Sequence, residues 1–200
     1  IESLNAGIVS PHQIIKFESV SNINKYNEPQ MRPYERCSTL VVKAPMKAGK
    51  TKTLRAYIDQ YKDPIIRVLS FRQTFGASIA SDLEGFSLYS NFQGDITPDK
   101  HPRCIVQIES LHRLRDVDMC DRYSVDLLIL DEMESILDQF SSGLHKHFNM
   151  SFAIFEWLFK HTKHVICMDA NICDRTYNVI KLMRPQYDVC FHWNTFNRAI

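Results

Sequence analysis

The sequence predicts an α/β fold, with a mostly parallel sheet of about seven strands and helices on both faces. Three observations predict it. Residues 40–54 contain an apolar run, a short loop and a helix start; strand-like runs alternate with segments of helical period along the chain; and the Leu-Leu-Ile-Leu run at 127–130 ends directly in Asp131 and Glu132. Apolar strands that alternate with helices pack as a parallel sheet joined by right-handed crossovers.

The first half of the chain is expected to contain four strands. Residues 1–36 show no sustained hydrophobic period, so we expect an irregular lead-in before a single domain at 37–200. The expected strands are apolar runs, one beginning at Leu40 and the others at 65–69, 86–89 and 104–108. The expected helices follow them at 54–61, 75–83 and 109–114, and the Gly- and Pro-containing stretch 90–103 is expected to form a loop.

The second half of the chain is expected to contain three more strands, at 127–130, 164–168 and 187–193. Its expected helices have apolar side chains three or four positions apart, at 133–140, 152–159 and 172–183. Pro185 ends the last of them because proline cannot continue a helix. Ser141, Ser142 and Gly143 separate the first two.

Composition restricts function only weakly. The chain has 24 basic and 23 acidic residues, so its charge of +1 neither requires nor excludes a nucleic-acid partner. Six cysteines occur without a Cys-x-x-Cys pair, which favours reduced core thiols of an intracellular protein over a disulfide framework. The eight histidines lack metal-ligand spacing, and we expect them on the solvated surface.

No membrane partner is expected. No apolar run approaches the roughly 18 residues of a membrane span, and no signal pattern begins the chain. We therefore expect an intracellular protein, located in the nucleus if its source is eukaryotic or viral. Because the first residue is Ile1 and no polar tail follows, we also expect a piece of a longer chain.

The loop after the first strand carries the clearest chemical signal. It consists of Ala44, Pro45, Met46, Lys47, Ala48, Gly49, Lys50 and Thr51. A strand that turns into a helix directs unpaired backbone N–H groups and the positive end of the helix dipole at one point, where a phosphate group can bind. Lys50 is then placed to contact the β- and γ-phosphates of ATP, and the Thr51 hydroxyl to bind Mg²⁺.

Asp131 and Glu132 are the expected partners of this loop. An apolar strand that ends in two carboxylates places Asp131 beside the Mg²⁺ ion and Glu132 where it can orient the attacking water. The alternative is an ordinary helix start, at which acidic residues are favoured by about 0.3–1 kcal/mol. The Gly-Lys-Thr sequence upstream favours the first interpretation.

Three further polar clusters follow strands, and in a parallel sheet the carboxyl ends of the strands share one edge. They are 71–74 with Arg72 and Gln73, 109–113 with Ser110, His112 and Arg113, and 169–171 with Asp169 and Ala170. The alternative for the first two clusters is a plain connection between a strand and a helix.

These motifs together resemble the herpesvirus-type replication origin-binding proteins of helicase superfamily 2. The resemblance covers residues 27 to about 183. It rests on Glu28-Pro29-x-Met31-Arg32-Pro33, the loop 44–51, Ser70-x-Arg72-x-x-Phe75, the run 106–113, Leu130-Asp131-Glu132-x-Glu134-Ser135 and Met168-Asp169-Ala170. It implies a RecA-like, ATP-binding N-terminal lobe.

The resemblance also implies roles for the individual residues. Lys50, Asp131 and Glu132 would support ATP hydrolysis, with Thr51 and Asp131 at the Mg²⁺ ion, and Asp169 and Ala170 would couple the two sites. Contacts with nucleic acid would come from Arg72, Gln73, Ser110, His112 and Arg113. The implied partners are DNA, single-stranded or at a replication origin, and a C-terminal helicase lobe with an arginine finger, which the 200 residues lack.

Two positions depart from the expected loop. Ala44 replaces the first Gly of the phosphate-loop pattern, and Lys47 replaces a loop Gly of the family. If position 47 requires a positive φ, Lys47 is strained by about 1 kcal/mol. Decay of the loop would leave a non-catalytic binding module for nucleic acid or protein; a small P-loop kinase or GTPase is disfavoured because no acceptor-site or guanine-specific motif is visible.

Overall fold

The structure, a computed structural model, describes residues 16–71, 73–118, 122–141 and 146–196. An eight-stranded, entirely parallel sheet forms its centre, in the order β1-β8-β2-β7-β6-β3-β5-β4. The strands are β1 Ile23–Tyr26, β2 Thr39–Lys43, β3 Ile66–Ser70, β4 Ser87–Leu88, β5 Arg103–Gln107, β6 Leu127–Asp131, β7 His164–Asp169 and β8 Val189–Asn194. The predicted α/β class with a parallel sheet is confirmed.

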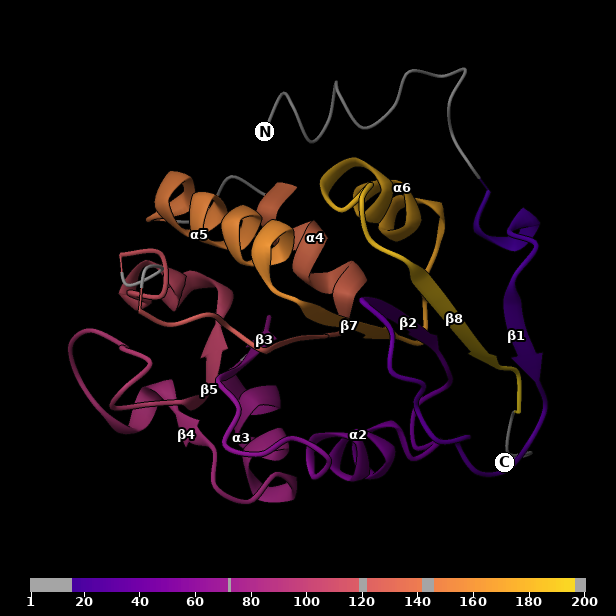
Figure 1. Ribbon diagram of the computed structural model, residues 1–200, viewed down its shortest axis with the longest axis horizontal. Coiled ribbons are helices and arrows are strands. Elements are labelled where there is room, and N and C mark those ends of the chain that lie inside the picture. Colours follow the sequence, from indigo (N-terminus) through magenta and orange to yellow (C-terminus); the bar gives the residue numbers. More distant parts are fainter. Residues whose placement is uncertain (1–15, 72, 119–121, 142–145, 197–200) are drawn as a thin grey trace.

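Helices cover both faces of this sheet, as predicted. Figure 1 shows α4, α5 and α6 on one face and α2 and α3 on the other. The α-helices are α2 Lys50–Ile58, α3 Gln73–Asp82, α4 Met133–Ser141, α5 Phe148–His161 and α6 Asp174–Met183, and the short 3₁₀ helices are η1 Phe17–Ser19, η2 Tyr89–Asn91 and η3 Ile108–Arg113. None of the described helices is long and apolar enough to cross a membrane.

The lead-in is not wholly irregular, which corrects the expectation for 1–36. Residues 23–26 form β1, which pairs with β8 from Ile23 opposite Phe191 to Tyr26 opposite Asn194. Four residues with only Tyr26 fully buried carry too short a pattern for periodicity to detect. Pairing with β1 covers an edge of β8 that would otherwise present unpaired backbone groups.

The central strands are buried on both faces, which explains their continuous apolar runs. All five residues of β6 are buried, and Val42 of β2 and Ile129 of β6 have no exposed surface. Removal of such side chains from water contributes about 1.5–3 kcal/mol each for a Val, Leu or Ile. The packed centre therefore fixes the positions of the strand ends to which the candidate site belongs.

Two arginines are also fully buried inside this fold. The Arg67 guanidinium on β3 binds both carboxylate oxygens of Asp116, at 2.7 and 3.0 Å, and donates to the carbonyls of His101 and Pro102. Arg184, after α6, donates to the Thr39 hydroxyl at 2.9 Å and to backbone carbonyls that include Thr162. A buried guanidinium must find its hydrogen-bond acceptors inside the protein. The acceptors of both arginines lie on segments that are distant in sequence, so each side chain joins those segments.

One histidine contradicts the expected solvated surface. His192 on β8 is only 1% exposed, and its ring contacts those of Tyr26 and Tyr34, each with centroids 6.2 Å away. Burial lowers the pKa of this imidazole, so it stays neutral in the core at neutral pH. His12 and His145 lie outside the described residues.

Candidate functional site

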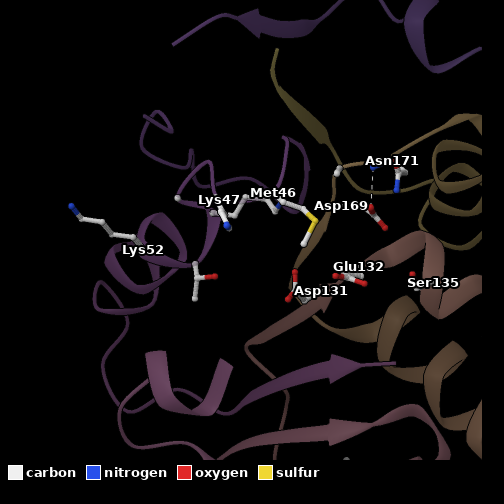
Figure 2. Close-up of a pocket in the computed structure, with 12 residues that line it drawn as sticks. Met46, Lys47, Lys52, Asp131, Glu132, Ser135, Asp169 and Asn171 are labelled. Atoms are coloured by element: carbon white, nitrogen blue, oxygen red, sulfur yellow. Dashed lines mark hydrogen bonds between the residues drawn. The ribbon is translucent and has the colours of Figure 1, made fainter. Parts of the chain in front are cut away.

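A cleft of about 440 Å³ opens at the carboxyl ends of β2, β7 and β6, which are neighbours in the sheet. Its lining comes from the loop after β2 and from the ends of β6 and β7: Met46, Lys47, Gly49, Lys50, Thr51, Lys52, Asp131, Glu132, Ser135, Asp169, Ala170 and Asn171. Figure 2 shows Asp131 and Glu132 on the side of the cleft opposite Lys52. Residues separated by up to 125 positions in sequence thus meet at one edge, as the strand-end rule predicts.

The loop enters α2 through a left-handed glycine. Gly49 is the N-cap of α2 with φ 93° and ψ 18°. A Cβ atom built on it would meet nothing within 4 Å, so the backbone angle and not the space requires glycine here. The turn brings the first N–H groups of α2, which lack partners within the helix, to the cleft, where they can bind an anion.

Lys50 points back into the loop. Its Nζ donates to the carbonyl oxygens of Ala44 at 2.8 Å and Pro45 at 3.2 Å. Burial lowers the pKa of this amine, while Asp131, Asp169 and Glu132 act in the opposite direction. A partly desolvated ammonium held only by neutral carbonyls would gain from a phosphate, because hydrogen bonds between charged groups are roughly twice as strong.

Asp131 is the most buried carboxylate at the end of β6. It is 8% exposed, and desolvation raises its pKa to about 6, although the Lys50 ammonium pulls the pKa down. Glu132 and Asp169 push it up further because they are like charges. The charged form of Asp131 is therefore disfavoured mainly by its burial, and a divalent cation beside it would stabilise that form.

Two residues that line the cleft have positive φ although they are not glycines. Lys47 has φ 61° and Glu132 has φ 59°. The left-handed region costs about 1–2 kcal/mol per residue with a side chain, and such strain concentrates at functional sites. At Glu132 this conformation occurs between β6 and α4, and its half-buried side chain lines the cleft. The positive φ of Lys47 is the condition under which the sequence analysis expects strain of about 1 kcal/mol at this residue.

Asp169 connects three elements around the cleft. Its carboxylate accepts hydrogen bonds from the backbone N–H groups of Glu134 and Asn171, each at 2.9 Å, and the Asn171 contact is visible in Figure 2. Its backbone carbonyl accepts from the N–H of Ala44 at 3.2 Å. These bonds join the phosphate loop to β7 and to the start of α4, and the coupling role of Asp169 stays a prediction.

Sequence reasoning gave no role to Glu134 and missed its partner Arg175. The Glu134 carboxylate is buried beside the cleft and binds the Arg175 guanidinium at 2.7 Å, the backbone N–H of Cys173 at 3.2 Å and the Thr176 hydroxyl. These contacts join α4 to α6. The available signal was an acidic residue directly after Met133, close to the apolar face of its expected helix.

Three of the predicted contacts with nucleic acid, Ser110, His112 and Arg113, lie apart from the cleft. Arg72 is outside the described residues, and Gln73 is placed only as the first residue of α3. Ser110, His112 and Arg113 form part of η3 after β5, and β5 is separated from β6 by β3. The ring of His112 lies 4.2 Å from that of His147, between centroids.

The Arg113 guanidinium is largely engaged within the protein, and its expected contact with nucleic acid stays a prediction. Three of its nitrogens donate to backbone carbonyls, those of Gly94 at 2.7 Å, Phe92 at 2.8 Å and Tyr89 at 2.9 Å. A guanidinium committed to three carbonyls holds the loop between η2 and β5 in place. It therefore has few donors left for a phosphate, since it carries five N–H groups in all.

A second hollow of about 340 Å³ borders the cleft on the other side of the loop. Its lining comes from the segment between β1 and β2, from the phosphate loop, and from α2 and the turn after it: Pro29, Gln30, Met31, Pro33, Tyr34, Lys47, Ala48, Gly49, Lys52, Thr53, Ala56, Tyr57 and Gln60. The Tyr34 hydroxyl donates to the carbonyl of Lys50 at 3.2 Å, which attaches the lead-in to the loop. Lys47, Gly49 and Lys52 line both spaces.

Comparison with known proteins identifies a family and several relatives of this chain. Residues 18–199 match the family described as origin of replication binding protein. A protein of African swine fever virus, provisionally named helicase/primase complex protein, is 48% identical over 200 residues, which cover 96% of this chain and 18% of that protein. The replication origin-binding protein of human herpesvirus 6B is 34% identical over 168 residues, which cover 80% of this chain and 20% of that protein.

Solved structures support the fold. A DEAD box protein from Methanococcus jannaschii superposes with a TM-score of 0.51 at 15% identity, over 77% of this chain and 45% of that one. Such low identity shows a shared RecA-like helicase fold and nothing finer. The chain spans about a fifth of the length of the curated relatives that it matches.

Proposed function

This chain belongs to the family of origin of replication binding proteins, and we propose that it is the ATP-binding motor lobe of a helicase that acts on DNA in replication. The observation that carries the proposal is the meeting of Lys50 and Thr51 with Asp131 and Glu132 in one cleft. A phosphate-binding loop opposite two carboxylates is the arrangement that phosphoryl transfer needs, because catalysis depends on positioning and charge.

The residues present fit a Mg²⁺ ion. Thr51 and Asp131 both line the cleft and offer the oxygen ligands that Mg²⁺ prefers, and Asp131 is a buried carboxylate whose charged form a cation would stabilise. Bound Mg²⁺ would neutralise charge on the phosphates. Thr51 and Asp131 would hold it.

The protein's own groups would act as follows. Lys50 would exchange its bonds to the Ala44 and Pro45 carbonyls for phosphate oxygens, and the N–H groups at the start of α2 would bind the same phosphates. Glu132 would orient the attacking water and accept its proton. Asp169 would pass the movement of the loop to α4 through its bond to the Glu134 N–H.

The remainder of the nucleotide would extend past the loop. The second hollow shares Lys47, Gly49 and Lys52 with the cleft, so a ligand whose phosphates occupy one can reach the other. DNA would bind along the same sheet edge on the β3 and β5 side, with proposed contacts from Arg72, Gln73, Ser110, His112 and Arg113. Contacts of this kind are salt-sensitive and independent of base sequence.

ATP hydrolysis by the full-length protein tests the proposal. We expect Glu132→Gln to lower the hydrolysis rate by about 10²- to 10⁴-fold with ATP affinity retained, because the variant removes a catalytic base but leaves the phosphate contacts. Glu84→Gln is the matched control, since the Glu84 side chain is 88% exposed and pairs with Arg55 on the surface. Equal rates in wild type and Glu132→Gln would contradict the proposal.

One observation favours a second candidate, a site that binds nucleotide without turnover. Lys47 occupies a left-handed position at the mouth of the cleft, where strain could hold the loop out of its productive shape. Mg²⁺-dependent ATP binding in a wild-type protein that hydrolyses no faster than Glu132→Gln would establish this alternative.

A further inference from the structure

Two cysteines and an aspartate that are far apart in sequence meet at the amino end of the sheet. The Sγ atoms of Cys37 and Cys190 and a carboxylate oxygen of Asp188 all lie within 4.8 Å of one another. Cys37 lies just before β2, and β8 brings up the other two because Leu40 pairs with Cys190. This edge is opposite the nucleotide cleft, so the cluster is independent of the proposed function.

The chemistry of the three donors selects a particular class of ligand. Two thiols with one carboxylate form a donor set typical of zinc, which binds sulfur at about 2.3 Å and carboxylate oxygen at about 2.0–2.2 Å in tetrahedral geometry. Donors around such an ion lie roughly 3.3–3.8 Å apart. The three donor atoms lie within 4.8 Å of one another, so small side-chain rotations would bring them to these separations.

Neighbouring groups already orient these donors. The hydroxyl and the backbone N–H of Ser38 both donate to the Asp188 carboxylate, the N–H at 3.3 Å. Hydrogen bonds of this kind to a carboxylate ligand orient it and contribute about 10- to 100-fold to affinity. The Cys37 thiol donates to the Thr39 carbonyl at 3.4 Å, a bond that would end when the thiol loses its proton to bind the metal.

The three donors differ in burial, so that one is held in the core and another is accessible to solvent. Cys37 is buried, Cys190 is half-buried and Asp188 is exposed. The ring of His164, on the same edge, has its Nδ1 3.1 Å from the Cys37 carbonyl oxygen and so anchors the segment before β2 to β7. An ion can thus approach from the Asp188 side without any opening of the core.

We propose that Cys37, Asp188 and Cys190 bind a thiophilic divalent cation of the Zn²⁺ type, with the fourth coordination position open to solvent. The ion would join the start of β2 to the start of β8 at the end of the sheet remote from the phosphate loop. Both thiols would lose their protons to the solvent on binding, so affinity would fall as the pH is lowered.

Zinc titration of the full chain under reducing conditions, in competition with a chromophoric chelator, tests this site. We expect Cys190→Ser to lower Zn²⁺ affinity by more than about 100-fold, because a lost ligand affects affinity more than a lost supporting hydrogen bond. Co²⁺ substituted for Zn²⁺ should give the absorption bands of tetrahedral thiolate coordination, and these bands should be lost in Cys190→Ser. Cys173→Ser is the matched control, since Cys173 is an exposed thiol outside the cluster.

Cys190 is the position to change because it is only half-buried, whereas a polar group at buried Cys37 endangers folding. Equal Zn²⁺ affinity in wild type and Cys190→Ser would overturn the proposal. So would a Co²⁺ spectrum without thiolate bands. A chain that binds no Zn²⁺ after full reduction, and whose mass before reduction shows a bond between Cys37 and Cys190, would also overturn it in favour of a disulfide.

Discussion

Two sets of oppositely charged side chains, Arg67 with Asp116 in the core and Lys50 with Asp131 at the carboxyl edge of the sheet, are arranged differently. Under the loop before β5, the Arg67 guanidinium binds Asp116 through two nitrogens and donates to backbone carbonyls through the third. At the carboxyl edge, Lys50 and Asp131, both within the described chain, form no ion pair, and Lys50 binds neutral carbonyls instead. The first pair is complete, whereas the second keeps a cation and an anion apart.

This difference separates a structural use of buried charge from a ligand-binding one. A satisfied pair stabilises the fold as long as both partners remain, because an orphaned buried charge is very unfavourable. An unsatisfied pair lowers the stability of the protein without ligand and makes binding of phosphate and cation favourable. The raised pKa of Asp131 and the lowered pKa of Lys50 are the signatures of the second kind.

Removal of one partner of the complete pair should have the largest effect. We expect Asp116→Ala to reduce the free energy of unfolding by about 3–5 kcal/mol, because Arg67 is left charged in the core. Urea unfolding followed by circular dichroism measures this. Asp95→Ala is the control, since that exposed partner of Arg115 should change stability by less than about 1 kcal/mol.

Neutralisation of the cleft carboxylate should act in the opposite direction. The pKa of Asp131 is raised above its ordinary value, so its charged form is disfavoured in the folded chain. Asp131→Asn should therefore raise the free energy of unfolding at pH 7, by at most about 3 kcal/mol.

This gain should shrink as the pH falls from about 6 toward 4, because wild-type Asp131 then takes up its proton in the folded state. Urea titrations of both proteins at pH 7 and pH 5 compare the two conditions. A lower free energy of unfolding for Asp131→Asn at pH 7 would contradict this expectation, because it would show that the Asp131 charge stabilises the fold as the Asp116 charge does.

Removal of the Lys50 ammonium should weaken ligand binding and leave the fold intact. We expect Lys50→Ala to weaken ATP binding by about 10- to 100-fold, which corresponds to the loss of a charged hydrogen bond of about 1.5–3 kcal/mol. Isothermal titration calorimetry with Mg²⁺ and ATP measures the affinity. Lys62→Ala removes an exposed lysine of equal charge and should leave affinity unchanged.

The smallest effect is expected at Lys47. Lys47→Gly should relieve a left-handed side chain and change the free energy of unfolding by no more than about 1 kcal/mol, because glycine also adds entropy to the unfolded chain. Melting temperature and ATP hydrolysis should be measured together. A rise in hydrolysis would identify Lys47 as a brake on turnover; a fall would show that its ammonium assists at the triphosphate.

The sequence by itself determined the parallel α/β fold and the edge at which the site lies. Apolar runs such as 127–130 and the turn at Gly49-Lys50 are local signals, since burial on both faces and a left-handed turn each select particular residue types. Their order along the chain then brought Lys50, Asp131 and Asp169 to neighbouring strands. The roles of these residues in catalysis stay predictions.

Only the tertiary structure decided which polar groups are already engaged. Arg113 has the sequence context of a phosphate contact but donates to loop carbonyls. The four residues of β1 are too few for a sequence pattern to detect, and their pairing with β8 identifies them as a strand. The distance between Cys37 and Cys190 depends on the pairing of β2 with β8. Hydrogen-bond satisfaction and the proximity of distant residues depend on long-range packing, which no local pattern of residues contains.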